Sequence, residues 1–440
     1  MATETDSHYL TRVAELGDRR EVVSTCAIHG ENDIKLVEKG TRIDSTLLEK
    51  LLRHKLLRPI DECVSVEGAV TTSDLAGLLE QCLEANAALA AVKNAFGSSH
   101  ALGGLAARAA LETPLAFKLT LARELNPAHF EHAIETALVA AALARASGMP
   151  DDDVVAALEA GYFHDIGELH LDPAVLGLTR SLTEAERRHI CSHPVIAHLV
   201  LREFPRYRAA VGTAVLQHHE RLDGSGYPKG LRGDRISPLG HVLMVSEVAA
   251  TLLRRGEGDP RAHIRMVLGL NRRKFSAELL AIATRWLGGE IGPDTVGSAE
   301  PQDVAALEGA FARISAILGD WKEIHGDRAA TGAPSDAFAE LVDGRVAALS
   351  HALVQTGFDW RVPEQFMSSL GSGPEARYEM AVLARETQWQ LREILLEARR
   401  SRDGIPCTSP GIRAAVSGWI EKACASMAAA QAVAPAPAAD

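Results

Sequence analysis

Residues 218–231 read HHERLDGSGYPKGL, and this stretch decides how the rest of the chain is interpreted. Two adjacent histidines point about 100° apart on a helix, so they cannot share one narrow apolar stripe. Three glycines and a proline follow, a composition that suits a backbone that turns tightly or lets a ligand come close. The segment is therefore either a solvent-facing helix end with a turn behind it or one half of a metal site.

The composition indicates a helical globular protein. The chain has 440 residues, enough for two or three domains, and its 47% hydrophobic and 24% charged residues are ordinary for such a protein. Aromatic residues are sparse and alanine-rich segments are frequent, so we expect a mainly α fold. The net charge of −12 argues against binding the backbone of a nucleic acid, and we expect no nucleic-acid partner.

The sequence also indicates the cellular compartment in which the protein is found. The six cysteines are scattered without a CxxC pair, and the N-terminus has no basic-then-apolar signal pattern. No uncharged apolar run approaches the roughly 18 residues that a membrane span needs. We therefore expect a soluble, cytoplasmic protein with reduced thiols and no membrane insertion.

The chain divides into four predicted regions. Residues 1–104 are predicted to form a small α+β module for regulation or packing. They contain strand-favouring runs and a leucine-rich helical pattern over 45–57. Residues 105–290 are predicted to form a helical domain that carries the motifs described below. Residues 291–430 predict a helical C-terminal extension of unassigned role, after a linker at 288–303 that is rich in Gly, Pro and acidic residues. Residues 431–440 predict a disordered Ala/Pro tail.

Helix-start signals support the helical prediction for the central region. Asn126 and Pro127 suit the first positions of one helix, and Thr183 with Glu186 forms a capping-box pattern at another. A further helix is predicted from about Tyr207 up to His218 and His219.

Ten of the seventeen histidines lie between residues 129 and 241. One histidine at a helix end is more often a satisfied surface or core residue, but packing alone does not explain the whole set. A pair of divalent ions needs a bridging carboxylate, histidines on each side and a bridging water. The doublet His164–Asp165 could supply the bridge and one histidine. The other candidate ligands lie on three further predicted helices: His132, His193, His218 and His219.

The motifs resemble those of the HD-GYP family. HDIG at 164–167, HP at 193–194 and HHERLDGSGYPKGLRG at 218–233 occur in the family's order, and the last matches its pattern HHExxDGxGYPxGLxG at every defined position. The resemblance covers about residues 120–285 and implies an HD-type helical bundle for the domain predicted at 105–290. It implies a bacterial signalling enzyme that hydrolyses cyclic di-GMP to a linear dinucleotide, using a hydroxide that bridges two metals.

The resemblance also implies the site residues and the cofactors. Two divalent ions are expected, with iron or manganese favoured. The ligands of the first ion would be His132, His164, Asp165 and Glu247, and those of the second Asp165, His193, His218 and His219. Catalysis would depend on His164 and Asp165. The loop would border the substrate through Gly224, Gly226, Tyr227 and Pro228, with Arg254 as a substrate-binding cation. Glu220, Asp223 and Glu168 would lie behind the ligands, fixing the loop and orienting imidazoles.

Four positions depart from the family pattern. Glu168 stands where the family usually has a lysine, and Glu247 replaces an aspartate. A Tyr–Arg pair that usually follows is absent, which is why Arg254 is considered for substrate. Ala128 stands where three-metal members have a glutamate, so two metals are expected. The remaining histidines of the region are interpreted as surface or unassigned residues: His129, His170, His189, His198 and His241.

Two alternatives to a cyclic di-GMP phosphodiesterase stay open. The substitutions at Glu168 and Glu247 fit a catalytically degenerate binding or scaffold protein in nucleotide signalling. HD-domain enzymes also accept varied nucleotides, so another nucleotide could be the substrate. The expected partner is thus cyclic di-GMP or a related nucleotide, and the flanking regions could mediate a homodimer or bind a signalling protein.

Overall fold

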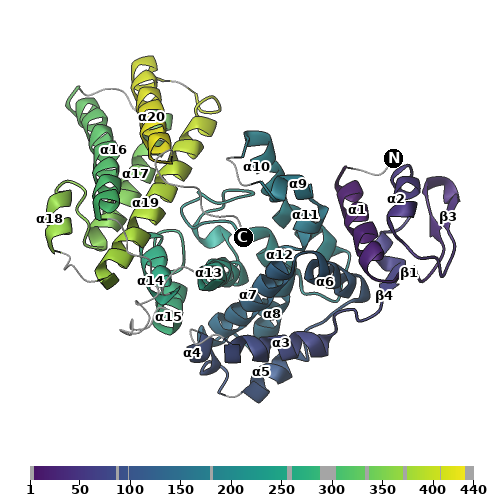
Figure 1. Cartoon of the computed structure of the whole chain (residues 1–440). Coiled ribbons are helices and arrows are strands. Elements are labelled where there is room, and N and C mark those ends of the chain that lie inside the picture. Colours follow the sequence, from purple (N-terminus) through teal and green to yellow (C-terminus); the bar gives the residue numbers. More distant parts are fainter. Residues whose placement is uncertain are drawn as a thin grey trace. The chain divides into compact units, whose positions relative to one another are not determined.

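A computed structural model of the chain is shown in Figure 1. It describes residues 4–85, 89–97, 99–178, 182–254, 260–287, 304–331, 336–369, 374–406 and 408–431. The predicted linker at 288–303, and the predicted tail except its first residue, lie outside these ranges. The chain forms two compact units, residues 1–255 with 274–287 and residues 256–273 with 288–440. The mainly α prediction is confirmed.

The first unit begins with a small module of helix and sheet. It contains α1 (Glu4–Arg19), η1 (Glu31–Asp33), α2 (Ser45–Leu52) and η2 (Ile60–Glu62). Two antiparallel pairs complete it: β1 (Val22–Ser24) with β4 (Val64–Val66), and β2 (Ile28–His29) with β3 (Lys35–Val37). The helix predicted over 45–57 ends at Leu52, because the following residues pair with the end of β2. Leu57 N donates to His29 O, and Glu31 N donates to Lys55 O.

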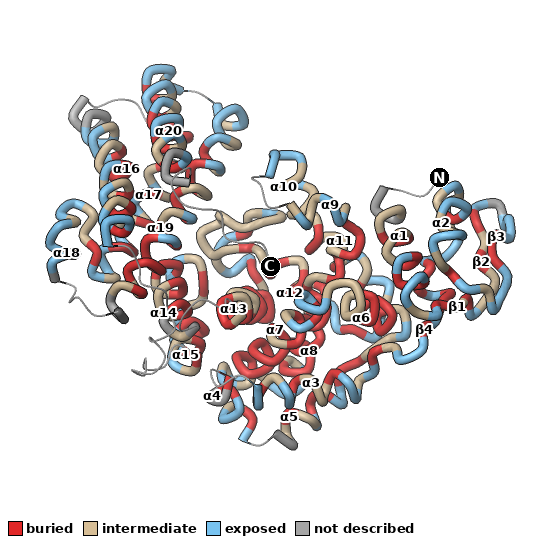
Figure 2. The backbone as a smooth tube through the Cα atoms, viewed as in Figure 1, coloured by how far each residue is buried: buried red, intermediate tan, exposed pale blue. Residues whose placement is uncertain are grey.

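A helical bundle follows the module in the same unit. Its helices are α3 (Thr72–Ala85), α4 (Ala90–Lys93), α5 (Ser99–Ala106), α6 (Thr113–Leu125), α7 (Pro127–Ala146), α8 (Asp151–Phe163), η4 (Ile166–His170), α9 (Pro173–Leu176), α10 (Glu184–Ile190), α11 (His193–Arg202), α12 (Ala209–Gln217), η5 (Gly233–Arg235), α13 (Pro238–Arg254) and α15 (Ala277–Leu287). Figure 2 shows that buried residues concentrate in α7, α8 and α13.

The predicted helix starts are confirmed. The Asn126 side chain accepts a hydrogen bond from His129 N at the start of α7, and Thr183 and Glu186 form a capping box on α10. Helices α7 and α8 pack at backbone distance, because a Cβ at Gly161 would lie 2.3 Å from Ala137 Cα. This close packing sets α8, which leads directly into His164, firmly against its neighbour.

A buried polar network ties the N-terminal module to the bundle. Lys118 Nζ on α6 lies 2.9 Å from Asp61 Oδ2, and their side chains are only 4% and 3% exposed. The same ammonium lies 3.7 Å from the centroid of the Tyr9 ring and 3.2 Å from His170 Nε2. The Tyr9 and His170 rings are stacked, with centroids 4.5 Å apart. The network therefore connects α1 to η4, the segment that follows Asp165.

The second unit is a helical bundle. It contains α14 (Pro260–Leu270), α16 (Val304–Thr331), α17 (Ala337–Gln355), α18 (Pro363–Ser369), α19 (Pro374–Ser401) and α20 (Pro410–Gln431). Aromatic contacts such as Phe311–Phe358 and Trp321–Trp419 lie in its core. The second unit includes α14, so the division into compact units does not coincide with the domain boundary predicted near residue 290. That domain boundary stays a prediction. In the described part of the chain, no helix has the length and apolar character of a membrane span.

The buried ion pair makes a prediction about stability. Replacing Lys118 by alanine leaves the Asp61 carboxylate buried without its cation, and we expect the free energy of unfolding of the first unit to fall by about 3–5 kcal/mol. Urea unfolding measures this change. The matched control is Lys35→Ala, which removes an exposed pair with Glu38 and should cost less than about 1 kcal/mol. Equal, small losses in both variants would contradict the structural importance of the buried pair.

Candidate metal centre

Three candidate ligands are held by carbonyl groups at helix ends. His164 follows the last residue of α8, His193 begins α11 shortly after the end of α10, and His218 follows the last residue of α12. Each directs Nδ1 at the carbonyl three residues earlier. The distances are 2.8 Å to Gly161 O, 2.8 Å to Ile190 O and 2.6 Å to Val215 O. A carbonyl accepts only from N–H, so each Nδ1 holds a proton and Nε2 remains the donor atom for a metal.

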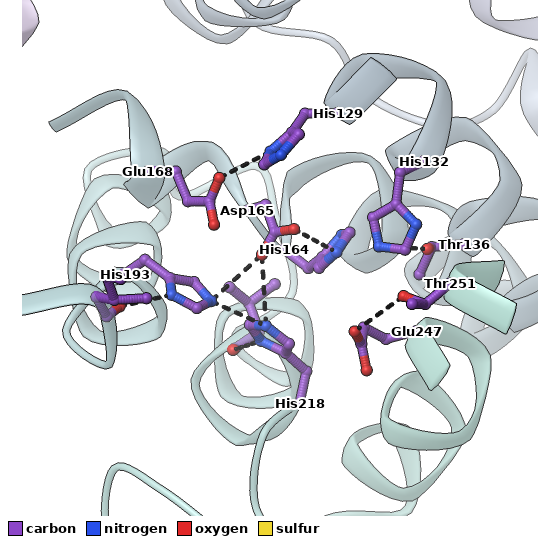
Figure 3. A network of polar contacts seen from close by, with 12 residues as sticks. His129, His132, Thr136, His164, Asp165, Glu168, His193, His218, Glu247 and Thr251 are labelled. Atoms are coloured by element: carbon purple, nitrogen blue, oxygen red, sulfur yellow. Dashed lines mark hydrogen bonds and ion pairs between the residues drawn. The ribbon is translucent and has the colours of Figure 1, made fainter. Parts of the chain in front are cut away.

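The Nε2 atoms of these histidines converge on Asp165 (Figure 3). His164 Nε2 lies 2.9 Å from Asp165 Oδ2, while the Nε2 atoms of His193 and His218 lie 3.3 and 3.6 Å from Oδ1. The latter two nitrogens are also only 3.2 Å apart. With protons on the Nδ1 atoms, lone pairs face one another and a carboxylate, an arrangement that requires protons or cations between them. The donor set therefore fits bound metal ions.

A buried atom without a hydrogen bond supports this fit. Asp165 Oδ2 is near His164 Nε2, but no hydrogen bond of acceptable geometry reaches this fully buried nitrogen. Buried polar atoms are rarely left without a partner, and a metal ion bound at this nitrogen would supply one.

The ligand atoms fall into two groups that share one carboxylate. Within each group, all atoms lie within 4.8 Å of one another. The groups are Asp165, His193, His218 and His219, and His132, His164 and Asp165. The structure thus brings together six of the seven residues considered as ligands, from α7 and from the segments that follow α8, α10 and α12. Glu247, the seventh, lies on α13 outside both groups.

The electrostatics keep most of the imidazoles neutral. Burial lowers the pKa of His132 to about 3 and that of His218 to about 4, and it holds the pKa of His219 well below its usual value. A neutral imidazole is the form that binds metals. These side chains are therefore ready to bind a cation at neutral pH without first losing a proton.

The charges of Asp165 and His164 stabilise each other. Burial alone would raise the pKa of Asp165, but the charge of the His164 imidazole, with smaller contributions from His193 and His218, holds it well below its usual value. Burial lowers the pKa of His164, but Asp165 outweighs burial and the net pKa is about 9. With protein groups alone, a proton on His164 thus balances the buried carboxylate. A metal ion would take over that balancing charge and release the proton.

The glycine-rich loop rests directly on His219, the second of the two adjacent histidines. A Cβ at Gly226 would lie 2.4 Å from His219 O, so only glycine allows this approach, and Gly224 has a φ of +78°. The Tyr227 ring is stacked on His219 with centroids 4.6 Å apart, and the peptide bond to Pro228 is cis. The unusual composition of the opening stretch is therefore explained by a loop that covers a ligand.

Two acidic residues hold this loop in place. Glu220 is fully buried, and its carboxylate accepts hydrogen bonds at 2.8 Å from Lys229 N and from Leu231 N. Asp223 Oδ1 accepts from the backbone and the hydroxyl of Ser225 at 2.9 and 2.6 Å. Both carboxylates thus fix the loop backbone.

Two predicted site residues have other partners. Arg254 lies 3.1 Å from Glu131 and 3.4 Å from Glu135, so its guanidinium is already engaged by two carboxylates. Glu247 accepts a long hydrogen bond of 3.4 Å from Thr251 Oγ1 on the next turn of α13. Burial raises the pKa of Glu247, opposed mainly by the charge of Arg221.

The structure also gives partners to histidines that were interpreted as surface or unassigned residues. His129 Nδ1 lies 2.8 Å from Glu168 Oε2 beside the centre, and this contact raises the pKa of His129 (Figure 3). Its position one turn before His132 was the available signal. His170 is buried in the network with Lys118, and His189 Nε2 accepts a hydrogen bond from Asp172 N at 3.0 Å.

The fold and the centre define a helical protein with a histidine-rich site built around one shared carboxylate. Residues 105–265 match the family model described as the HD domain. This part of the chain is an HD domain, and the recognition of the HD-GYP type is confirmed.

Two curated relatives match part of the chain. The chain is 34% identical over 119 residues to a cyclic di-GMP phosphodiesterase of Pseudomonas aeruginosa, covering 27% of this chain and 29% of that protein. It is 31% identical over 117 residues to a 3'3'-cGAMP-specific phosphodiesterase of Vibrio cholerae, covering 27% and 25%. The matches thus span less than a third of each relative.

Among solved structures, an HDG"Y"P protein from Bdellovibrio bacteriovorus aligns with a TM-score of 0.33 at 15% identity. The alignment covers 62% of this chain and 98% of that one.

Gly167 provides a test of how the centre is assembled. A Cβ at this position would lie 2.1 Å from His193 O, so Gly167→Ala must push η4 away from α11 and separate Asp165 from His193. We expect metal affinity to fall at least about tenfold, the usual scale for displaced support of metal ligands, as measured by metal titration.

The matched control is Gly104→Ala in α5, where the added Cβ meets no atom within 4 Å. That substitution should leave metal affinity unchanged and, if anything, favour the helix. Unaltered metal binding by Gly167→Ala would show that the close contact between η4 and α11 is not needed.

Proposed function

We propose that this chain is a metal-dependent phosphodiesterase that opens cyclic di-GMP to a linear dinucleotide. The observation that carries the proposal is the position of Asp165 between two groups of histidine ligands. Relatives named as phosphodiesterases of cyclic di-GMP and of 3'3'-cGAMP support the substrate class. A cytoplasmic location in a bacterial cell, as expected from the sequence, belongs to the same proposal.

The proposed ligand sets follow the two groups. One ion would be held by His132, His164 and Asp165, with Glu247 as a further ligand from α13, and the other by Asp165, His193, His218 and His219. Mixed imidazole and carboxylate ligands suit iron and manganese among other divalent ions. When bound, a pair of such ions lowers the pKa of a water and stabilises the charge that develops on a phosphodiester.

Once it is loaded with two divalent ions, the centre favours an anionic substrate. The imidazoles of the second group other than His193 have lowered pKa values and contribute no positive charge of their own, and Asp165 contributes one negative charge. Two divalent cations exceed the charge of Asp165 and Glu247 together, so the loaded centre has a net positive charge. That charge attracts phosphate, while the loop around Tyr227 restricts access to the His219 side.

A second candidate function rests on Glu168. Its carboxylate faces His129 beside the centre, and an anion there disfavours a nearby phosphate unless His129 is protonated. This observation favours a binding role without turnover, and the relative named as specific for 3'3'-cGAMP makes a different cyclic dinucleotide a further candidate. Both alternatives keep the same nucleotide class and the same ligand groups.

The test is turnover of both cyclic dinucleotides by protein loaded with manganese or iron without oxygen. We expect cyclic di-GMP to be opened, and Asp165→Asn to lower kcat/KM at least about a hundredfold, since it removes the charge shared by both ligand groups. The control Asp234→Asn changes an exposed aspartate of η5 and should retain full activity.

Each outcome separates the candidates. Hydrolysis of 3'3'-cGAMP alone would replace the proposed substrate. Tight binding of either nucleotide without hydrolysis would favour the binding role. The absence of both binding and turnover would overturn the proposal.

A further inference from the structure

Arg221 lies beside the ligands of the centre but takes no part in the ligand groups. It follows His219 and Glu220 in the chain, and its guanidinium NH1 donates to His218 O at 3.1 Å and to Glu220 O at 2.7 Å. The guanidinium carbon lies 5.1 Å from the centroid of the Phe275 ring. Two carbonyls and an aromatic face thus hold the group in one orientation, so little further ordering is needed for it to bind a ligand.

In the described part of the chain no carboxylate forms a close ion pair with Arg221, although the more distant charges of Glu247, Asp223 and Glu220 act on it. Among the described residues, none places a carboxylate oxygen within 4.0 Å of this guanidinium, whereas Arg254 contacts both Glu131 and Glu135. The two hydrogen bonds that anchor Arg221 both use NH1. The edge formed by Nε and NH2 is suited to two parallel hydrogen bonds to a phosphate.

Arg221 is anchored to the backbone of the segment that carries two ligands of the candidate metal centre, His218 and His219. Its charge acts on Glu247 of α13, on His219 and on Tyr227 of the loop, all three of which line the site. The carbonyls that anchor it belong to His218 and Glu220, on either side of the ligand His219. The guanidinium is therefore held beside the backbone of His218 and His219, two ligands of the second group.

We propose that the Arg221 guanidinium binds a phosphodiester oxygen of the cyclic dinucleotide and positions it at the centre. The proposal rests on the proposed function, because the ligand is the substrate of that site. Arg221 would thus supply the substrate-binding cation that the sequence analysis sought in Arg254. It is a substrate-positioning residue and not a metal ligand.

The test uses Arg221→Gln and Arg221→Lys in the full chain loaded with manganese. Glutamine removes the charge, and lysine keeps the charge but loses the two-pronged edge. We expect KM for cyclic di-GMP to rise about tenfold to a hundredfold in Arg221→Gln, the usual range for hydrogen bonds to charged groups, and less in Arg221→Lys. Metal content should stay unchanged, and added guanidinium ion should partly restore KM.

The control is Arg235→Gln, which changes an exposed arginine of η5 and should alter neither KM nor metal content. Unchanged KM in a metal-replete Arg221→Gln protein would overturn the proposal. If Arg221→Gln loses metal, a metal-replete Arg221→Lys protein decides by its KM. Loss of metal from both variants would mean that Arg221 only supports the loop.

A binding measurement separates this proposal from the proposed function. Calorimetry with the phosphorothioate analogue of cyclic di-GMP should show weaker binding to Arg221→Gln than to the unmodified chain. If the unmodified chain hydrolyses no cyclic dinucleotide but this difference persists, the phosphodiesterase assignment fails and the role of Arg221 stands. Equal affinity for the analogue would contradict the role of Arg221 whatever the activity.

Discussion

The structure of the centre depends on one buried carboxylate, that of Asp165, surrounded by imidazoles whose orientation is fixed by backbone carbonyls. Three helix ends present a carbonyl to Nδ1, so the opposite nitrogen of each ring must face Asp165. Such an arrangement is unfavourable without positive charge, which explains why His164 acquires a raised pKa in the protein alone. Two cations would satisfy the same requirement and are the basis of the proposed activity.

The surrounding fold holds these helix ends in place. Gly161 and Gly167 allow backbone contacts of α8 with α7 and of η4 with α11 that any side chain would prevent. Glu220 and Gly226 fix the loop over His219 by backbone hydrogen bonds and close approach. The N-terminal module contributes through Lys118 and its partners, which pack on η4 directly after the shared carboxylate. The geometry of the centre is therefore a property of the whole first unit.

Much of this arrangement could be predicted from the sequence, since the candidate ligands stand in short motifs at helix ends with recognisable start signals. The contacts of Glu168 with His129 and of Lys118 with Asp61 could not, because each joins residues far apart in the chain and no local pattern encodes such pairs. Arg254 was an understandable choice of substrate cation from its place on α13, but tertiary packing gives it two glutamates. Arg221 lies within the motif itself, and its orientation depends on Phe275, which is distant in sequence.

The most direct test of the account is an anomalous difference map from crystals of the manganese-loaded protein. We predict two peaks with the Asp165 carboxylate between them, one beside His132 and His164 and the other beside His193, His218 and His219. A single peak, or peaks away from Asp165, would contradict the shared-carboxylate centre on which the proposed function depends.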